Sequence, residues 1–163
     1  MSDIARFNEM GVHRGADFTM PGAEAHYPPD LQLEPMHLDI ALRVDVEKCT
    51  AEGGVTATIH ANHAGANEIS LHAVDFEDLD VRDADGNELH WDYDGKRIHA
   101  EWSKPFAQDE ARKLVVRYKV VKPVSGLFFS SPSKEYPDAG TWAATDHETE
   151  RARHWLPCID LPN

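Results

Sequence analysis

Residues 36–46 carry a large apolar side chain at every second position, and this pattern narrows the possible folds more than any other feature. The apolar residues recur at every second position: Met36, Leu38, Ile40, Leu42, Val44 and Val46. Successive side chains of a β-strand point to opposite faces. A period of two therefore predicts a strand with one face in the core and the other in water.

Shorter segments repeat the alternation down to residue 120. They cover residues 55–61, 69–73, 79–81, 89–93, 98–102 and 114–120. Asp85-Gly86 and Asp94-Gly95 are typical hairpin turn sequences, because glycine accepts a positive φ. Strands that recur about every ten residues with turns between them favour an all-β fold. We expect an antiparallel β-sandwich, or a saddle-like pair of curved sheets, with no long helix.

The segments on either side of these strands are irregular. Residues 1–35 hold several glycines and prolines and show no lasting period, so we expect an extended N-terminal arm. Residues 36–163 then form one β-sandwich domain, which fits the length of 163 residues. Within it, residues 122–144 are rich in proline, glycine and serine, which predicts a functional or packed loop.

Composition disfavours several classes of partner. The chain has 29 acidic and 16 basic residues, a net charge of -13. Such a chain repels nucleic acid and anionic membrane surfaces, and no apolar run reaches the ~18 residues of a membrane helix. The only cysteines, Cys49 and Cys158, make no disulfide framework, which favours a cytoplasmic location with reduced thiols.

Three local features could hold a metal or a reactive group, and each has a simpler explanation. His60 and His63 stand at the end of a predicted strand, where their side chains point to opposite faces. Residues 83–87 resemble a calcium loop, but the glycine falls at the wrong position and a plain turn is favoured. Cys158 is predicted to be a buried structural cysteine rather than a reactive thiol.

The most informative sequence lies at residues 145–162, which we call the signature segment. It reads Thr-Asp-His-Glu-Thr-Glu-Arg-Ala-Arg-His-Trp-Leu-Pro-Cys-Ile-Asp-Leu-Pro. This resembles a motif in the N-terminal domain of aminopeptidase N-type zinc metallopeptidases, the gluzincin exopeptidases. Their pattern is Thr-Gln-x-Glu, three residues, Ala-Arg, two residues, Phe-Pro-Cys-x-Asp-x-Pro. Eight residues match in register: Thr145, Glu148, Ala152, Arg153, Pro157, Cys158, Asp160 and Pro162.

Two upstream segments are also similar to the family. Gly126-Leu127-Phe128 resembles its Gly-Leu-Tyr, and residues 69–73 resemble its Ile-x-Leu-His-Ala strand. The resemblance implies an all-β saddle domain that continues past the signature segment. A catalytic domain with Gly-x-Met-Glu-Asn and zinc-binding His-Glu-x-x-His motifs would follow, and neither motif occurs in these residues.

The resemblance therefore implies an N-terminal fragment of a zinc aminopeptidase. We expect no catalytic residue, no metal ligand and no cofactor within this fragment, and zinc in the downstream domain of an enzymatically active parent. The fragment alone should not hydrolyse peptides. If later strands are missing, we also expect self-association through an exposed sheet edge.

The resemblance assigns two substrate-binding residues. Glu148 matches the glutamate that binds the free α-amine of a peptide N-terminus, which enforces removal of N-terminal residues. Asp146 stands where the family has glutamine, which lines the pocket for the first side chain of the substrate. Beside Glu148, an aspartate would favour basic first residues. Arg153 and Asp160 are expected to hold the turn together.

Two alternatives belong to other functional classes. One is a non-catalytic scaffold, as in a subunit of the general transcription factor TFIID that shares the family architecture without peptidase activity. The loss of the glutamine at Asp146, and Trp155 before Leu-Pro-Cys, both favour this alternative slightly. The other is a generic β-sandwich binding module with no enzyme attached.

Overall fold

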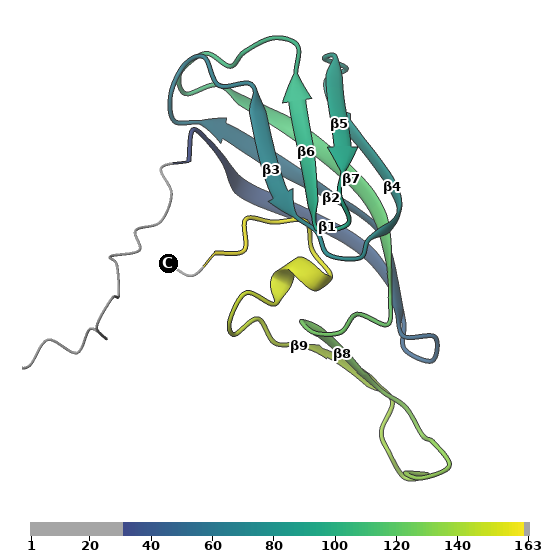
Figure 1. Cartoon of the computed structure of the whole chain (residues 1–163). Coiled ribbons are helices and arrows are strands. Elements are labelled where there is room, and N and C mark those ends of the chain that lie inside the picture. Colours follow the sequence, from purple (N-terminus) through teal and green to yellow (C-terminus); the bar gives the residue numbers. More distant parts are fainter. Residues whose placement is uncertain (1–30, 162–163) are drawn as a thin grey trace, which may run out of the picture.

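The computed structural model describes residues 31–161, and strands dominate them (Figure 1). Most of the predicted arm, residues 1–30, lies outside the described residues, as does Pro162. The strands are β1 (Leu33–Asp45), β2 (Thr50–Ala61), β3 (Glu68–His72), β4 (Glu77–Asp83), β5 (Leu89–Tyr93), β6 (Arg97–Trp102), β7 (Ala111–Val121), β8 (Leu127–Ser130) and β9 (Trp142–Thr145). The only helical element of this part is a 3-10 turn, η1 (Ala152–His154).

Two antiparallel sheets make the body of the domain. The larger sheet has the order β1-β2-β7-β4, and the smaller has the order β3-β6-β5. The smaller sheet lies across one face of the larger one (Figure 1). The predicted all-β, antiparallel sandwich is therefore confirmed.

The core fills the space between the two sheets, and the alternating side chains of the central strands supply it. On β2, Val55, Ala57 and Ile59 are at most 1% exposed. On β7 the same face carries Leu114 and Val116, which are fully buried. In antiparallel pairs, directly opposed residues point to the same face. The register opposes Val55 to Val116 and Ala57 to Leu114, so the period-two pattern builds one continuous apolar layer.

The first strand departs from the expectation that one of its faces lies in the core. It begins at Leu33, three residues before the alternation, and it is an edge strand of the larger sheet. Leu38 and Leu42 pack against the core, but Ile40 and Val44 are 46% and 45% exposed. The smaller sheet has three strands and the larger has four, so the apolar face of β1 is only partly covered.

The two predicted hairpin turns serve different connections. Asp94-Gly95 joins β5 to β6 in a true hairpin, and Asp94 Oδ1 accepts the backbone N–H groups of Lys96 and Arg97 at 2.8 and 2.6 Å. Asp85-Gly86 instead links β4 in the larger sheet to β5 in the smaller one. The prediction of a hairpin was wrong there, because a local turn sequence does not determine which sheet the next strand joins.

Asp83, just before that second turn, is a buried carboxylate. Its oxygens accept backbone N–H bonds from Asp85 and Asn87 at 2.8 and 3.0 Å, and the indole N–H of Trp102 at 2.8 Å. Internal donors thus occupy the carboxylate, which agrees with the predicted plain turn rather than a calcium loop.

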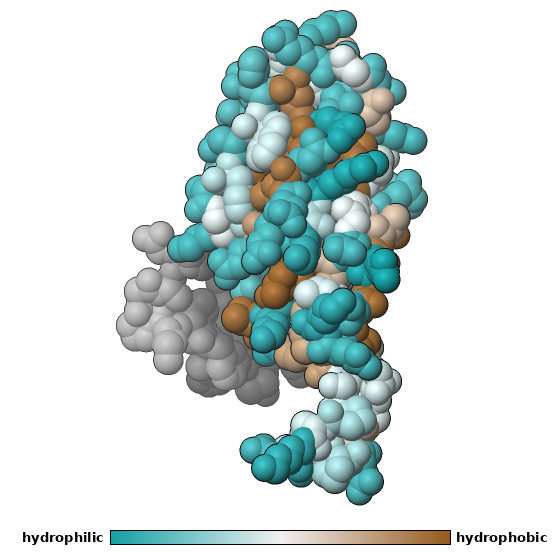
Figure 2. All heavy atoms as spheres, turned by 90° about the vertical axis from the view of Figure 1, so that its right-hand side faces the viewer, coloured by the Kyte–Doolittle hydropathy of each residue, from teal (hydrophilic) through white to brown (hydrophobic). Residues whose placement is uncertain are grey.

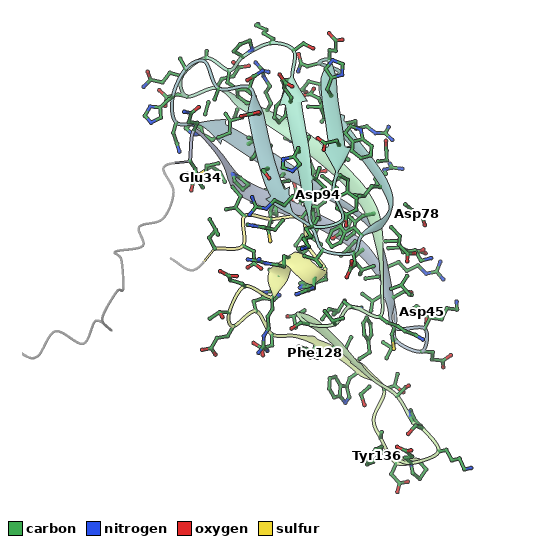
Figure 3. All side chains as sticks on the ribbon, in the orientation of Figure 1. Glu34, Asp45, Asp78, Asp94, Phe128 and Tyr136 are labelled. Atoms are coloured by element: carbon green, nitrogen blue, oxygen red, sulfur yellow. The ribbon has the colours of Figure 1, made fainter. Side chains whose placement is uncertain are left out.

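Residues 122–145 contain two strands that the sequence pattern did not predict. Strands β8 and β9 pair antiparallel, with Leu127 opposite Thr145 and Ser130 opposite Trp142. Their hairpin projects from the sandwich, with Tyr136 near its tip (Figures 1 and 3). On the side of the molecule shown in Figure 2, apolar side chains reach the surface in a narrow stripe among hydrophilic ones. Within residues 31–161, no helix is long and apolar enough to span a membrane.

Candidate functional site

The signature segment runs from the projecting hairpin back to the sandwich. Thr145 is the last residue of β9, and residues 146–151 form an exposed loop. The 3-10 turn η1 follows, and Leu156 and Pro157 are buried beyond it. Both ends of the exposed loop are therefore attached to regular structure.

An arginine–aspartate pair closes the second half of the segment. The Arg153 side chain donates through Nε to Asp160 Oδ2 at 3.0 Å, and the backbone N–H of Arg153 donates to the same oxygen at 3.1 Å. Arg153 Nη2 also donates to the Asp160 carbonyl and, at 2.9 Å, to Glu150 Oε2. This confirms the expectation that Arg153 and Asp160 hold the turn together.

His72 of β3 anchors the same turn to the smaller sheet. His72 and Cys158 exchange two backbone hydrogen bonds, at 2.7 and 3.1 Å, so the signature segment lies beside β3 and pairs with it through one antiparallel bridge. The imidazole Nδ1 of His72 accepts the backbone N–H of Asp160 at 3.1 Å. Burial lowers the pKa of His72 below its ordinary value, which favours the neutral ring that this acceptor role requires.

Tyr118 of β7 anchors the segment from the larger sheet. Its ring stacks on Phe76 at 4.5 Å between centroids, and its hydroxyl donates to the Trp155 carbonyl at 2.8 Å. The alternation of residues 114–120 predicts an inward side chain at this position, and a buried tyrosine hydroxyl needs a partner. The sequence could therefore have suggested a polar contact here, but not that its acceptor lies in the signature segment.

Gly126, the residue before β8, allows the exposed loop to approach the hairpin. Its carbonyl accepts the N–H of Asp146 at 3.1 Å, and its φ is +78°. A Cβ at this position would collide with the carbonyl oxygen of Arg151 and would lie 3.1 Å from Cδ1 of Trp155. Glycine is thus required twice, for the backbone conformation and for the close contact.

The two predicted substrate-binding residues lie together on the exposed loop, in different electrostatic settings. Asp146 Oδ1 accepts the backbone N–H of Glu148 at 3.1 Å, and Oδ2 accepts from Arg151 Nη1 at 2.8 Å. Among the described residues, the carboxylate of Glu148 has no hydrogen-bond or ion-pair partner. Asp146 therefore shapes the loop that carries Glu148, and Arg151 offsets the negative charge of Asp146.

The ring of His147 lies between these two acids in the chain and contacts Trp155. The indole N–H of Trp155 donates to His147 Nε2 at 2.9 Å, and the ring centroids are 5.6 Å apart. This contact fixes the loop against Trp155, the residue that follows η1. Sequence reasoning did not single out His147, and no local pattern indicated its partner.

The described residues do not offer a zinc site. No group of three or more histidine, cysteine or acidic side chains within residues 31–161 is arranged to hold a metal ion. Cys158 is half-buried rather than fully buried as predicted. Burial still raises the pKa of its thiol to about 12, so the thiol stays protonated, which fits a structural rather than a reactive cysteine.

A family model described as the peptidase M1 N-terminal domain matches residues 34–163. The chain belongs to this family. The match includes the whole signature segment and both upstream segments, and it confirms the resemblance to aminopeptidase N-type zinc metallopeptidases. The family is zinc-dependent, and its catalytic zinc lies in the domain that follows the N-terminal one. No curated protein matched the chain.

Solved structures of M1 enzymes share the fold. Yeast LTA4 hydrolase in complex with bestatin superposes with a TM-score of 0.65 over 88% of this chain and 24% of its own length, at 19% identity. The M1 zinc metallopeptidase of Deinococcus radiodurans, as a mutant bound to Tyr-Ser-Ala, gives 0.60 over 80% of this chain and 30% of its own, at 18% identity. The chain thus spans about a quarter to a third of these proteins.

Proposed function

We propose that this M1 N-terminal domain acts in a zinc aminopeptidase, where Glu148 binds the free α-ammonium group of a peptide substrate. The observation that carries the proposal is the setting of Glu148. Its carboxylate is exposed and unpaired among the described residues, on a loop fixed at both ends. A charge-assisted hydrogen bond to an ammonium is stronger than a neutral one. Such a group distinguishes a peptide N-terminus from an internal amide.

The charges around Glu148 support this assignment. Asp146 is paired with Arg151, and Glu150 is paired with Arg153 at 2.9 Å. Of the three acids in this loop, Glu148 is thus the one whose negative charge no arginine among the described residues neutralises. A single uncompensated carboxylate suits a monovalent cation such as an α-ammonium group.

We further propose that Asp146 acts first as a positioning residue, because its Oδ1 bond to the Glu148 N–H sets the course of the loop. A preference for basic first residues remains part of the proposal. It requires the Asp146 carboxylate to exchange Arg151 for the substrate side chain. An Asp146→Gln change should then lower kcat/KM for arginine substrates more than for leucine substrates.

The test uses the full-length protein that contains this chain. The Glu148→Gln variant keeps the size of the side chain and removes its charge. We expect it to lower kcat/KM for an aminoacyl fluorophore by about tenfold to a hundredfold, the equivalent of one charge-assisted bond. Glu135→Gln, an exposed glutamate in the β8–β9 loop, removes the same charge and should leave kcat/KM unchanged.

A binding measurement separates amine recognition from other effects. Leucinamide should inhibit the wild type more strongly than the analogue that lacks the amino group, and Glu148→Gln should remove most of this difference. Equal inhibition ratios in the wild type and the variant would refute the role of Glu148. If the full-length protein hydrolyses no aminoacyl substrate with zinc bound, the non-catalytic scaffold replaces the enzyme as its function.

A further inference from the structure

In the part of the chain that the structure describes, no strand pairs with the outer edge of β1. β1 has 13 residues, and its only strand neighbour within residues 31–161 is β2. Its one irregularity lies between Pro35 and His37, so residues 37–45 run regularly. The opposite edge, β4, has 7 residues and an irregularity between Glu77 and Asp80. Bulges and short strands protect sheet edges from pairing, and β1 lacks both over residues 37–45.

The backbone of β1 is oriented for pairing on this edge. The Ala41 carbonyl faces β2, because a Cβ on Gly53 of β2 would collide with its oxygen. Backbone groups alternate in direction along a strand, so those of Ile40 and Leu42 face away from β2. Ile40 also exposes apolar side-chain surface beside this edge. A second strand would satisfy the polar groups and cover the apolar ones.

The outer face of the larger sheet pairs opposite charges from strand to strand. Arg43 of β1 lies opposite Glu52 of β2, and Glu52 lies opposite Lys119 of β7. Lys119 lies opposite Glu77 of β4. The row therefore alternates in sign across all four strands and ends at β1 with a positive charge. A strand added at this edge is favoured if it places a negative charge opposite Arg43.

We propose that a second copy of this chain pairs with β1 in antiparallel register about a two-fold axis at Ala41. In this register, Asp39 of each copy lies opposite Arg43 of the other, which continues the alternation of charge. His37 of each copy lies opposite Asp45 of the other. The two copies then contribute two Asp39–Arg43 pairs of opposite charge and two His37–Asp45 pairs in which the imidazole can donate a hydrogen bond, and Ala41 meets its own counterpart at the centre.

The apolar face of β1 fits the same register. Ile40 lies opposite Leu42 of the second copy, and Leu38 lies opposite Val44, so apolar side chains meet only apolar side chains. Their outward backbone groups form the hydrogen-bonded pairs, while the charged residues occupy the closer non-hydrogen-bonded pairs.

Neighbouring registers lose the charge complementarity. Moving the two-fold axis to Leu42 places Asp39 opposite Asp45, which is a repulsive pair. Moving it to Ile40 places Asp39 opposite Ala41 and His37 opposite Arg43. The charges of β1 therefore select one register, with the axis at Ala41.

The test compares charge reversals by sedimentation equilibrium at about 0.15 M salt, where the Debye length is ~8 Å and the long-range repulsion of two acidic chains is screened. Asp39→Arg places two arginines opposite each other, and Arg43→Asp places two aspartates opposite each other. Each change should raise the dimer Kd by about tenfold. The double variant restores opposite charges and should return the Kd to within about threefold of the wild type. Asp138→Arg in the β8–β9 loop changes the net charge equally and should have no effect.

A covalent probe tests the register itself. An Ala41→Cys change places two cysteines at the centre of the non-hydrogen-bonded pair, where Cα atoms are ~4.5 Å apart and a disulfide can form. Mild oxidation should give a covalent dimer, and the Asp138→Cys control should stay monomeric. A wild-type chain that remains monomeric up to millimolar concentration would overturn the proposal, as would a double variant no better than the single ones.

Discussion

Replacing Gly126 with alanine is expected to detach the signature segment from the β8–β9 hairpin and to destabilise the domain. The new methyl group would meet the Arg151 carbonyl oxygen inside van der Waals contact, with Trp155 Cδ1 at 3.1 Å. The neighbour that must move is backbone rather than the end of a flexible side chain. Relief therefore requires the loop 146–151 to shift.

The expected loss of folding free energy follows from a comparison with Gly86. Both glycines have positive φ, +78° at Gly126 and +80° at Gly86, but a Cβ on Gly86 would meet nothing within 4 Å. An alanine at either site has a left-handed backbone cost of ~1–2 kcal/mol, partly offset by lower entropy of the unfolded chain. Only G126A adds an overpacking cost, which is ~1–3 kcal/mol. We therefore expect G126A to be less stable than G86A by this overpacking cost.

Urea unfolding of both variants is followed by tryptophan fluorescence and by circular dichroism. With a slope of ~2 kcal/mol per M, the midpoint of G126A should lie about 0.5–1.5 M below that of G86A. Hydrogen exchange should also rise in residues 146–156 of G126A and stay unchanged there in G86A. Equal midpoints for the two variants would refute the argument that Gly126 is required by the contact with Arg151.

Three further perturbations test the anchors of the fold. Tyr118→Phe removes the hydrogen bond to the Trp155 carbonyl and should cost ~1 kcal/mol in thermal unfolding, with an unchanged midpoint arguing against that anchor. Asp83→Ala leaves the buried indole N–H of Trp102 without its acceptor and should cost about 3 kcal/mol, whereas a loss below ~0.5 kcal/mol would contradict the assigned bond. Because burial depresses the pKa of His72 in the folded state, the unfolded state takes up its proton first. Stability should therefore be full above about pH 6.5 and fall as the pH drops below it, and His72→Gln should flatten this dependence in pH-dependent unfolding.

Alternation along the chain was sufficient to predict the seven strands of the two main sheets, but not β8 and β9. Val55, Ile59 and Leu114 recur at period two, and such residues can be buried on one side only if the segment is extended. The family could also be identified from local sequence alone, because the signature segment matches its motif at eight residues in fixed register. The roles of Arg153 and Asp160 in closing the turn followed from that resemblance.

The exposure of β1 and the contacts between distant residues could be learned only from the tertiary structure. The partial exposure of β1 depends on its place at the edge of a four-stranded sheet covered by three strands, and the sequence around Ile40 reads like a core strand. The meeting of His72 with Cys158, and of Tyr118 with Trp155, joins residues far apart in the chain. Asp146 and Glu148 have the same charge, yet only the fold brings Arg151 to one and leaves the other unpaired among the described residues. The period of a segment shows which of its side chains are buried, because burial requires only that apolar residues share one face. A specific contact between two side chains depends instead on which distant segment the fold places beside each of them.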